Sequence, residues 1–168
     1  MPKIIENLEQ RLIEEAKRQI EASGYGTMTI RSVAKGCGVG VGTVYNYFTS
    51  KEDLLARHLL ADWSQCTAAI QAVSTYSDTP RSVMLCIRDQ LVSFSTRHQS
   101  IFQDETARSS LAGSFGRYHS MLRSQLAEPL RKFCSSDFAA DFIAEALLTW
   151  TMADKPFDDI YGMLEKLF

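Results

Sequence analysis

The sequence predicts an all-α protein of about nine helices, with an N-terminal three-helix unit of the helix-turn-helix kind followed by a C-terminal helical unit. Apolar residues recur at helical spacing along almost the whole chain, and no segment shows a convincing strand pattern. Residues 29–51 read as two short helices joined at a glycine, followed by a serine-capped third. The 168 residues suffice for one ordinary core or for two small ones that share a helix.

The first two helices have clear start and stop signals. The first is expected to end at Ser23-Gly24, and Thr29 can cap the free amides of the second. Gly38 lies where the chain must leave the second helix through a left-handed conformation, which glycine adopts without steric cost. The stripe that the first helix turns inward consists of Ile5, Leu8, Leu12, Ala16 and Ile20.

The third helix has one apolar side and one polar side. Val44 and Phe48 are four residues apart and are expected to face the core. Thr43, Asn46 and Tyr47 then lie on a different side, where they can meet the major groove of DNA. Between residues 27 and 51 there are three basic residues and no acidic one, which suits contact with phosphate. These basic residues are Arg31, Lys35 and Lys51.

The remaining helices follow from capping signals, prolines and apolar stripes. Ser50 opens a fourth helix with a near capping box, and the polar residues 74–80 form the clearest linker. The expected helices run from 50 to about 73, from the Thr79-Pro80 cap onward, from 101 to a break at 111–114, from 115 to a kink or end at Pro129, and over about 137–153 and 157–167.

The net charge of −2 is unusual for a DNA-binding protein until it is divided along the chain. Residues 1–60 hold eight Lys or Arg against seven Asp or Glu, whereas residues 61–168 hold ten against thirteen. The acidic excess therefore lies in the second part. The sign of the face that meets DNA matters more than the total, and the acid-free stretch supplies a positive face.

Composition also bears on other classes of protein. No run of eighteen apolar residues occurs and the N-terminus is amphipathic, so a cytoplasmic protein without a membrane partner is expected. The cysteines show no C-x-x-C pair, which argues against a metal site and a disulfide framework. No histidine or cysteine has catalytic spacing, so neither an enzyme nor a cofactor is expected. The cysteines and histidines of the chain are Cys37, Cys66, Cys86, Cys134, His58, His98 and His119.

The motif T-x-x-x-V-A followed by G-V-G-V-G-T-V-Y-N-Y-F-x-S-K-E-D-L-L resembles the N-terminal domain of the tetracycline-repressor (TetR) family of transcription regulators. The resemblance implies a homodimer that binds a palindromic DNA operator and, in most cases, represses transcription. It also implies a DNA-binding domain over residues 1–52 and a helical domain over 53–168 that dimerises and binds a small-molecule effector, which lowers DNA affinity. An apolar or aromatic effector is expected, because few charges lie on the inward stripes of the second domain.

The resemblance assigns roles to individual residues of the segment 29–51. Thr43 and Asn46 align with positions that approach base edges, whereas Tyr45, Tyr47 and Lys51 align with phosphate contacts. Thr29 and Arg31 align with contacts from the preceding helix. The alternatives are that the Tyr45 ring packs inward and that Arg31 is a solvated surface charge. Gly40, Val41 and Gly42 depart from the commoner pattern, and they are kept as contacts because glycine permits close approach and valine can touch a thymine methyl.

The last two helices carry the dimer prediction, because in the family the corresponding pair packs against its copy in a four-helix bundle. The expected interface residues are Phe138, Phe142, Leu147, Trp150, Phe157, Tyr161 and Leu164. Completion of the monomer core is the alternative for these stripes. The effector pocket is expected among Met84, Phe94, Phe102, Phe115, Tyr118, Met121 and Trp150, although each is also a plausible core residue. Two further alternatives are redox control of DNA binding through Cys37 and a role in protein interaction.

Overall fold

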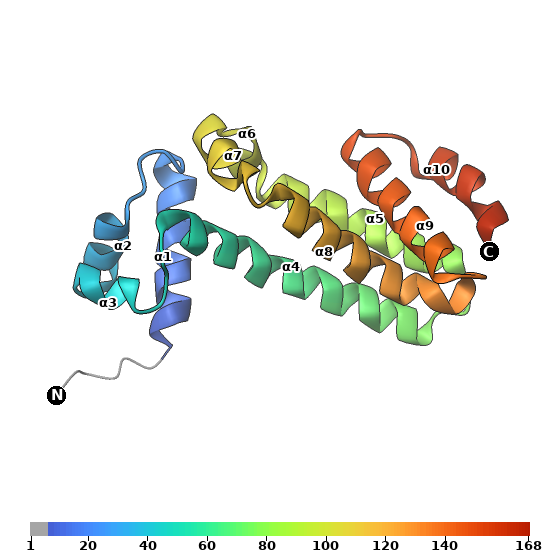
Figure 1. Cartoon of the computed structure of the whole chain (residues 1–168), viewed down its shortest axis with the longest axis horizontal. Helices are drawn as coiled ribbons and strands as arrows, with labels where there is room; N and C mark the ends of the chain where they lie inside the picture. Colours follow the sequence, from blue (N-terminus) through green and yellow to red (C-terminus); the bar gives the residue numbers. More distant parts are fainter. Residues whose placement is uncertain (1–6) are drawn as a thin grey trace. The chain divides into compact units, whose positions relative to one another are not determined.

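The computed structural model describes residues 7–168. The predicted stripe position Ile5 and the side chain of Phe115 lie outside this description. All regular structure in this range is helical, which confirms the all-α class (Figure 1). The helices are α1 Leu8–Ser23, α2 Ile30–Cys37, α3 Val41–Tyr45, α4 Lys51–Tyr76, α5 Pro80–Arg97, α6 Gln99–Gln103, α7 Glu105–Ala112, α8 Phe115–Ala127, α9 Asp137–Met152 and α10 Phe157–Leu164, with the 3₁₀ helices η1 Glu128–Phe133 and η2 Glu165–Leu167.

The chain forms two compact units that share α4. The first unit holds the chain up to Ala61 together with Gln99–Gly113, and the second holds Asp62–His98 and Ser114–Phe168. These units differ from a division at residue 52, because α6 and α7 belong with the N-terminal helices. The division at residue 52 concerns function, and it stays a prediction.

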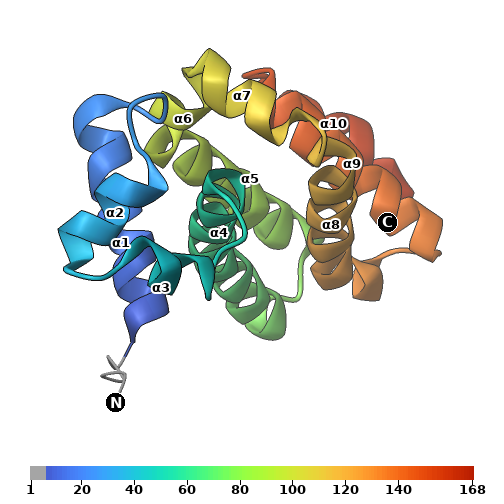
Figure 2. The ribbon, with the colours of Figure 1, turned by 60° about the vertical axis from the view of Figure 1, so that its left-hand side comes forward.

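The core of the first unit surrounds the inner face of α1. In both views α1, α2 and α3 lie side by side (Figures 1 and 2). Leu12, Phe48 and Leu54 are fully buried there, and Ile101 and Ala107 belong to the same apolar cluster. Residues 89 and 95 positions beyond Leu12 therefore complete the core that supports the N-terminal helices.

Local capping explains where several helices begin and end, as the sequence predicts. The Thr29 hydroxyl accepts a hydrogen bond from the Ser32 amide at 3.0 Å, and the Ser32 hydroxyl accepts one from the Thr29 amide. Thr79 caps α5, where Pro80 occupies the first turn. Pro129 lies in η1, directly after the end of α8. These contacts satisfy backbone groups that a helix end leaves without partners.

Two elements differ from the expected pattern. α4 continues to Tyr76 and thus takes in the first part of the expected linker 74–80. The single helix expected from residue 101 is instead two helices, α6 and α7, which accounts for ten α-helices in the described chain instead of nine. The cause is Asp104, whose side chain accepts a hydrogen bond from the Ala107 amide at 2.9 Å and caps a new helix.

The second unit is built around α5, α8, α9 and α10. Its core joins residues from each of these helices to the second half of α4. Met84, Ile143 and Leu147 are fully buried within it. Trp63 of α4 packs there and donates a hydrogen bond from Nε1 to Gln125 Oε1 of α8 at 2.7 Å. The second half of α4 is therefore fixed to the C-terminal helices of its own unit.

Candidate nucleic-acid interface

The turn between α2 and α3 is encoded by its local sequence. Gly38 has φ 69° and ψ 32°, the left-handed conformation that its position predicts. Its amide donates to the Lys35 carbonyl at 3.1 Å, and the Val39 amide donates to the Ala34 carbonyl at 2.9 Å. These two bonds close the end of α2 and redirect the chain into α3.

Two apolar side chains anchor residues 40–48, here called the reading segment, as predicted. Val44 and Phe48 are both fully buried in the core of the first unit. α3 itself is only five residues long, but the Phe48 amide still donates to the Val44 carbonyl at 3.0 Å. One helical turn therefore connects the two anchors and holds the polar residues between them on the opposite side.

None of the ten predicted DNA contacts is fully buried. Half-buried positions are Val41, Thr43 and Lys51. The exposed positions are Thr29, Arg31, Gly40, Gly42, Tyr45, Asn46 and Tyr47. Tyr45 exposes 53% of its surface, which favours an accessible ring over the inward-packed alternative. The ten positions extend from the N-cap of α2 at Thr29 to the first residue of α4 at Lys51.

The charge on this surface is positive. Arg31 and Lys35 are exposed on α2, and neither takes part in an ion pair among the described residues. Arg57 of the same unit is different, since it pairs with Glu9 at 3.1 Å and with Asp53 at 3.5 Å. The first two basic side chains therefore remain available for an anionic partner.

Lys51 has a partner that sequence reasoning missed. Its ammonium lies 4.0 Å from the centroid of the Tyr25 ring, in the segment between α1 and α2. Burial lowers the pKa of Lys51, and the negative charges of Glu52 and Asp104 act in the opposite direction. No local pattern links residues so far apart in sequence, because the contact depends on how α1 and α4 are packed.

The glycines of the reading segment have different structural settings. Gly40 is the N-cap of α3 and has an extended backbone without a side-chain cap. A Cβ added at Gly42 would meet nothing within 4 Å outside its own helix. Packing within the chain therefore does not require glycine at position 42, and the open space there leaves room for an approaching surface.

Cys37 lies at the end of α2, where it belongs to the core of the first unit. Its thiol donates a weak hydrogen bond to the Arg11 carbonyl at 3.4 Å. Burial raises the pKa of Cys37, which reduces the thiolate fraction that reacts with oxidants. These features favour a packed small residue over the redox alternative.

The expected effector residues differ in burial and in the unit to which they belong. Met84 is fully buried in the core of the second unit, whereas Phe102 is exposed and belongs to α6 of the first unit. Trp150 is 49% exposed on α9. These three positions differ in burial and in unit membership, and the expected pocket stays a prediction. Phe115 lies outside the described side chains.

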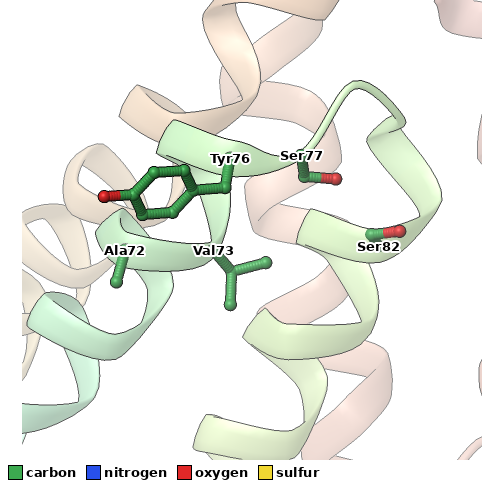
Figure 3. Close-up of a pocket in the computed structure, with 5 residues that line it drawn as sticks. All are labelled: Ala72, Val73, Tyr76, Ser77 and Ser82. Atoms are coloured by element: carbon green, nitrogen blue, oxygen red, sulfur yellow. The ribbon is translucent and has the colours of Figure 1, made fainter.

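The other three expected pocket residues remain together in the second unit. Phe94 and Met121 are partly buried against its core, and Tyr118 is half-buried on α8. Phe94 packs edge-on against Trp63, with ring centroids 5.3 Å apart. The larger of two open grooves, of about 460 Å³, contains none of the expected residues (Figure 3). It is lined by Ala72, Val73, Tyr76, Ser77 and Ser82.

The expected dimer residues divide into two sets. Phe138, Phe142 and Trp150 expose 78%, 52% and 49% of their surface on α9, and Tyr161 is half-buried. The other three belong to the chain's own core, which favours the alternative that these stripes complete the monomer core. These are Leu147, Phe157 and Leu164. The helical stripe predicted apolar faces correctly, but it did not distinguish the inner face of α9 from the outer one.

None of the helices that the structure describes has the length and apolar character needed to span a bilayer. Within residues 7–168, no three His, Cys, Asp or Glu side chains gather as a potential metal site. The exposed polar side chains of residues 29–47 carry hydroxyl, amide and basic groups, which can bind phosphates and base edges.

Comparison with known proteins identifies the reading segment. Residues 12–57 match the family described as "Bacterial regulatory proteins, tetR family". The chain is 32% identical over 74 residues to an uncharacterized HTH-type transcriptional regulator, YuxN, of Bacillus subtilis (strain 168). It is 35% identical over 54 residues to the HTH-type transcriptional regulator HbdR of Aromatoleum sp. (strain CIB). These matches cover 44% and 32% of this chain but only 25% and 24% of the two relatives.

Solved structures share the fold over nearly the whole chain. The TetR family repressor AlkX from Dietzia sp., implicated in biodegradation of n-alkanes, aligns with a TM-score of 0.67 at 15% identity, over 94% of this chain and 97% of that one. RolR without ligand aligns with a TM-score of 0.61 at 25% identity, over 94% and 89%. RolR is also known in complex with resorcinol, and FadR from Bacillus subtilis in complex with stearoyl-CoA. Residues 12–57 therefore resemble a family of bacterial regulatory proteins, and the solved structures share the fold of the chain.

Proposed function

We propose that the chain is a transcriptional regulator of the TetR family and that it represses transcription by binding a palindromic operator as a homodimer. A small, largely apolar effector releases it from the DNA. The observation that carries the proposal is that buried Val44 and Phe48 hold exposed polar side chains outward. Beside them lie Arg31 and Lys35, which form no ion pair among the described residues. A cytoplasmic location without a membrane partner belongs to the same proposal.

The residues of the reading surface divide by chemistry. Thr43 and Asn46 offer a hydroxyl and an amide to base edges, and an amide pairs well with adenine. Tyr45, Tyr47 and Lys51 contact phosphates, which fix the position of the protein on the duplex. The remaining contacts come from Thr29 and Arg31 of the preceding helix, with Arg31 suited to guanine, and from the backbone and small side chains of Gly40, Val41 and Gly42.

Dimerisation through α9 and α10 is supported by apolar side chains that the chain leaves exposed. Phe138 and Phe142 lie one turn apart on α9 with ring centroids 6.5 Å apart, and Trp150 lies two turns further along. Met163 of α10 is 79% exposed, and Tyr161 is half-buried. Burying these side chains against a second copy removes apolar surface from water, and a two-fold axis matches the symmetry of a palindrome.

The apolar effector is supported by the side chains in the second unit and by the relatives. Phe94, Tyr118 and Met121 are partly buried residues of that unit, and they supply aromatic and thioether groups without a charge. The resorcinol and stearoyl-CoA complexes of the structural relatives contain an aromatic ring and a long acyl chain. A ligand of this kind gains affinity from apolar burial, with a few polar groups for orientation.

The effector acts through a difference in affinity for two conformations, as any ligand that shifts an equilibrium must. α4 is the proposed lever, because Lys51–Ala61 belongs to the first unit and Asp62–Tyr76 to the second. A small rotation of this helix changes the separation of the two reading segments. Crystals of the DNA-bound and effector-bound dimers with unchanged separation would contradict this part of the proposal.

Selection of bound sequences from a random duplex library tests DNA recognition directly. We expect a palindrome whose half-sites lie about 34–36 Å apart, with affinity that falls steeply with salt. Tyr47→Ala should weaken binding at least several-fold, because it removes a phosphate contact. Tyr76→Ala is the matched control, since Tyr76 is 88% exposed but lies in the second unit. Weak binding that is uniform across sequences and unaffected by Tyr47→Ala would refute the proposal.

A further inference from the structure

The contact between Lys51 and Tyr25 joins the start of α4 to the segment that precedes α2. Lys51 Nζ lies 4.0 Å from the centroid of the aromatic ring, well inside the distance at which a cation is attracted to a ring face. Tyr25 is 1% exposed and belongs to the core cluster of the first unit. The ring is therefore a fixed support, whereas the lysine side chain is flexible by nature.

A lysine that contacts phosphate normally loses much side-chain freedom when DNA binds. Its charge is carried on a flexible four-carbon stem with three rotatable donors. A ring that already holds the ammonium removes part of this cost, because fewer conformations remain to be lost. The ring face occupies one side of the ammonium, and Lys51 is only half-buried, so its remaining N–H groups can reach an anion.

The charges around Lys51 explain why a support is needed at this position. Glu52 is the next residue, and both Glu52 and Asp104 act electrostatically on the lysine. An unsupported ammonium could turn toward either carboxylate and away from the DNA. The aromatic face attracts the cation without neutralising its charge, which preserves the charge for a phosphate.

We propose that Tyr25 is a positioning residue for DNA binding, whose buried ring holds the Lys51 ammonium in place for a backbone phosphate of the duplex. The inference rests on the proposed operator binding. Tyr25 itself does not touch DNA in this arrangement. Its effect passes entirely through Lys51, which gives the proposal a direct test by coupling.

The test uses the full-length chain and its selected duplex, with dissociation constants measured over a range of salt concentrations. Tyr25→Phe keeps the ring and its negative face. Tyr25→pentafluorophenylalanine keeps a ring of similar shape but withdraws electron density from the face. Both variants are compared in the wild-type chain and together with Lys51→Met, and thermal unfolding of each variant checks that the fold is intact.

We expect Tyr25→Phe to bind within about twofold of wild type, and the fluorinated variant to bind about two- to fivefold more weakly than Tyr25→Phe. Lys51→Met should weaken binding and reduce the slope of log affinity against log salt by about 1.8, because each of the two subunits loses one phosphate contact worth about 0.9. With Lys51→Met present, the two ring variants should bind equally.

Equal weakening by the fluorinated ring with and without Lys51→Met would overturn the proposal, because the ring would then act without the lysine. An unchanged salt slope in Lys51→Met would also overturn it, since Lys51 would make no phosphate contact. Failure of the proposed function gives a different result from failure of this inference. The wild-type chain itself would then show no sequence-selective, salt-dependent binding.

Discussion

Two glycines near the turn between α2 and α3 differ in whether their backbone conformation requires glycine. Gly38 has φ 69°, a conformation in which L-residues are strained, although an added Cβ would meet nothing within 4 Å. Gly42 lies inside α3, has equally open surroundings and needs no positive φ. The space for an added Cβ is therefore similar at the two positions, whereas the backbone conformation differs. Comparing substitutions at the two positions thus measures the cost of the left-handed backbone at residue 38.

We expect Gly38→Ala to destabilise the chain by about 1–2 kcal/mol, because alanine must adopt the left-handed conformation. Gly42→Ala should instead stabilise it by about 0.5–1 kcal/mol, through the helix propensity of alanine. Urea unfolding followed by circular dichroism measures both changes in the free energy of unfolding. A loss of similar size in the two variants would show that the left-handed backbone at residue 38 is not what requires glycine.

Residues whose role depends on neighbours in sequence were predictable, whereas those that depend on helix packing were not. Gly38 and the Thr29 cap follow from local chemistry. Gly36 does not, because an added Cβ there would lie 2.5 Å from Glu15 Cδ of α1, a contact set by the crossing of α1 and α2. The side chain of Glu15 is held beside it by Arg18, whose hydrogen bond lowers the pKa of Glu15 to about 2. The Tyr25 support of Lys51 was missed for the same reason.

The pair of short helices α6 and α7 is an element whose role the sequence did not indicate. Its helical character was expected, but the residues were assigned to the effector-binding domain. In the structure Ile101 and Ala107 complete the core of the first unit. Periodicity identifies an apolar face, but it carries no information about which other face covers it. Assignment to a unit therefore required the three-dimensional structure.

Ile101→Ala tests whether this element supports the reading unit. Ile101 is 3% exposed, so its truncation should cost about 2–5 kcal/mol through lost burial and a cavity. The cost should fall on the first unit, and hydrogen exchange of α1 and α2 amides should speed up. Ile87→Ala, which truncates an equally buried residue of the second unit, is the matched control. If Ile101→Ala left the exchange of α1 and α2 unchanged, the element would not support them.

At the scale of the whole molecule, some apolar residues face the chain's own core and others face the proposed second copy. The sequence of one chain does not separate these two kinds. α9 carries both kinds. Leu147 is fully buried, whereas Phe142 is 52% exposed, yet both fit the same helical apolar pattern. The all-α class and the reading surface followed from motifs and caps. The surface proposed for dimerisation is distinguished from the core only by the packing within the chain, which leaves Phe142 exposed and buries Leu147.

Phe142→Glu tests the proposed dimer at this scale. A carboxylate on the exposed apolar face of α9 would be buried without a partner in the dimer, but would stay hydrated in the monomer. We expect sedimentation equilibrium to show a loss of dimer, and the affinity for a two-half-site operator to fall much more than the affinity for a single half-site, because two linked reading segments bind with a high effective concentration. Val92→Glu is the control, since Val92 is 42% exposed on α5. If Phe142→Glu stayed dimeric and kept full operator affinity while folding normally, α9 would not form the interface, and the exposed rings would need another partner.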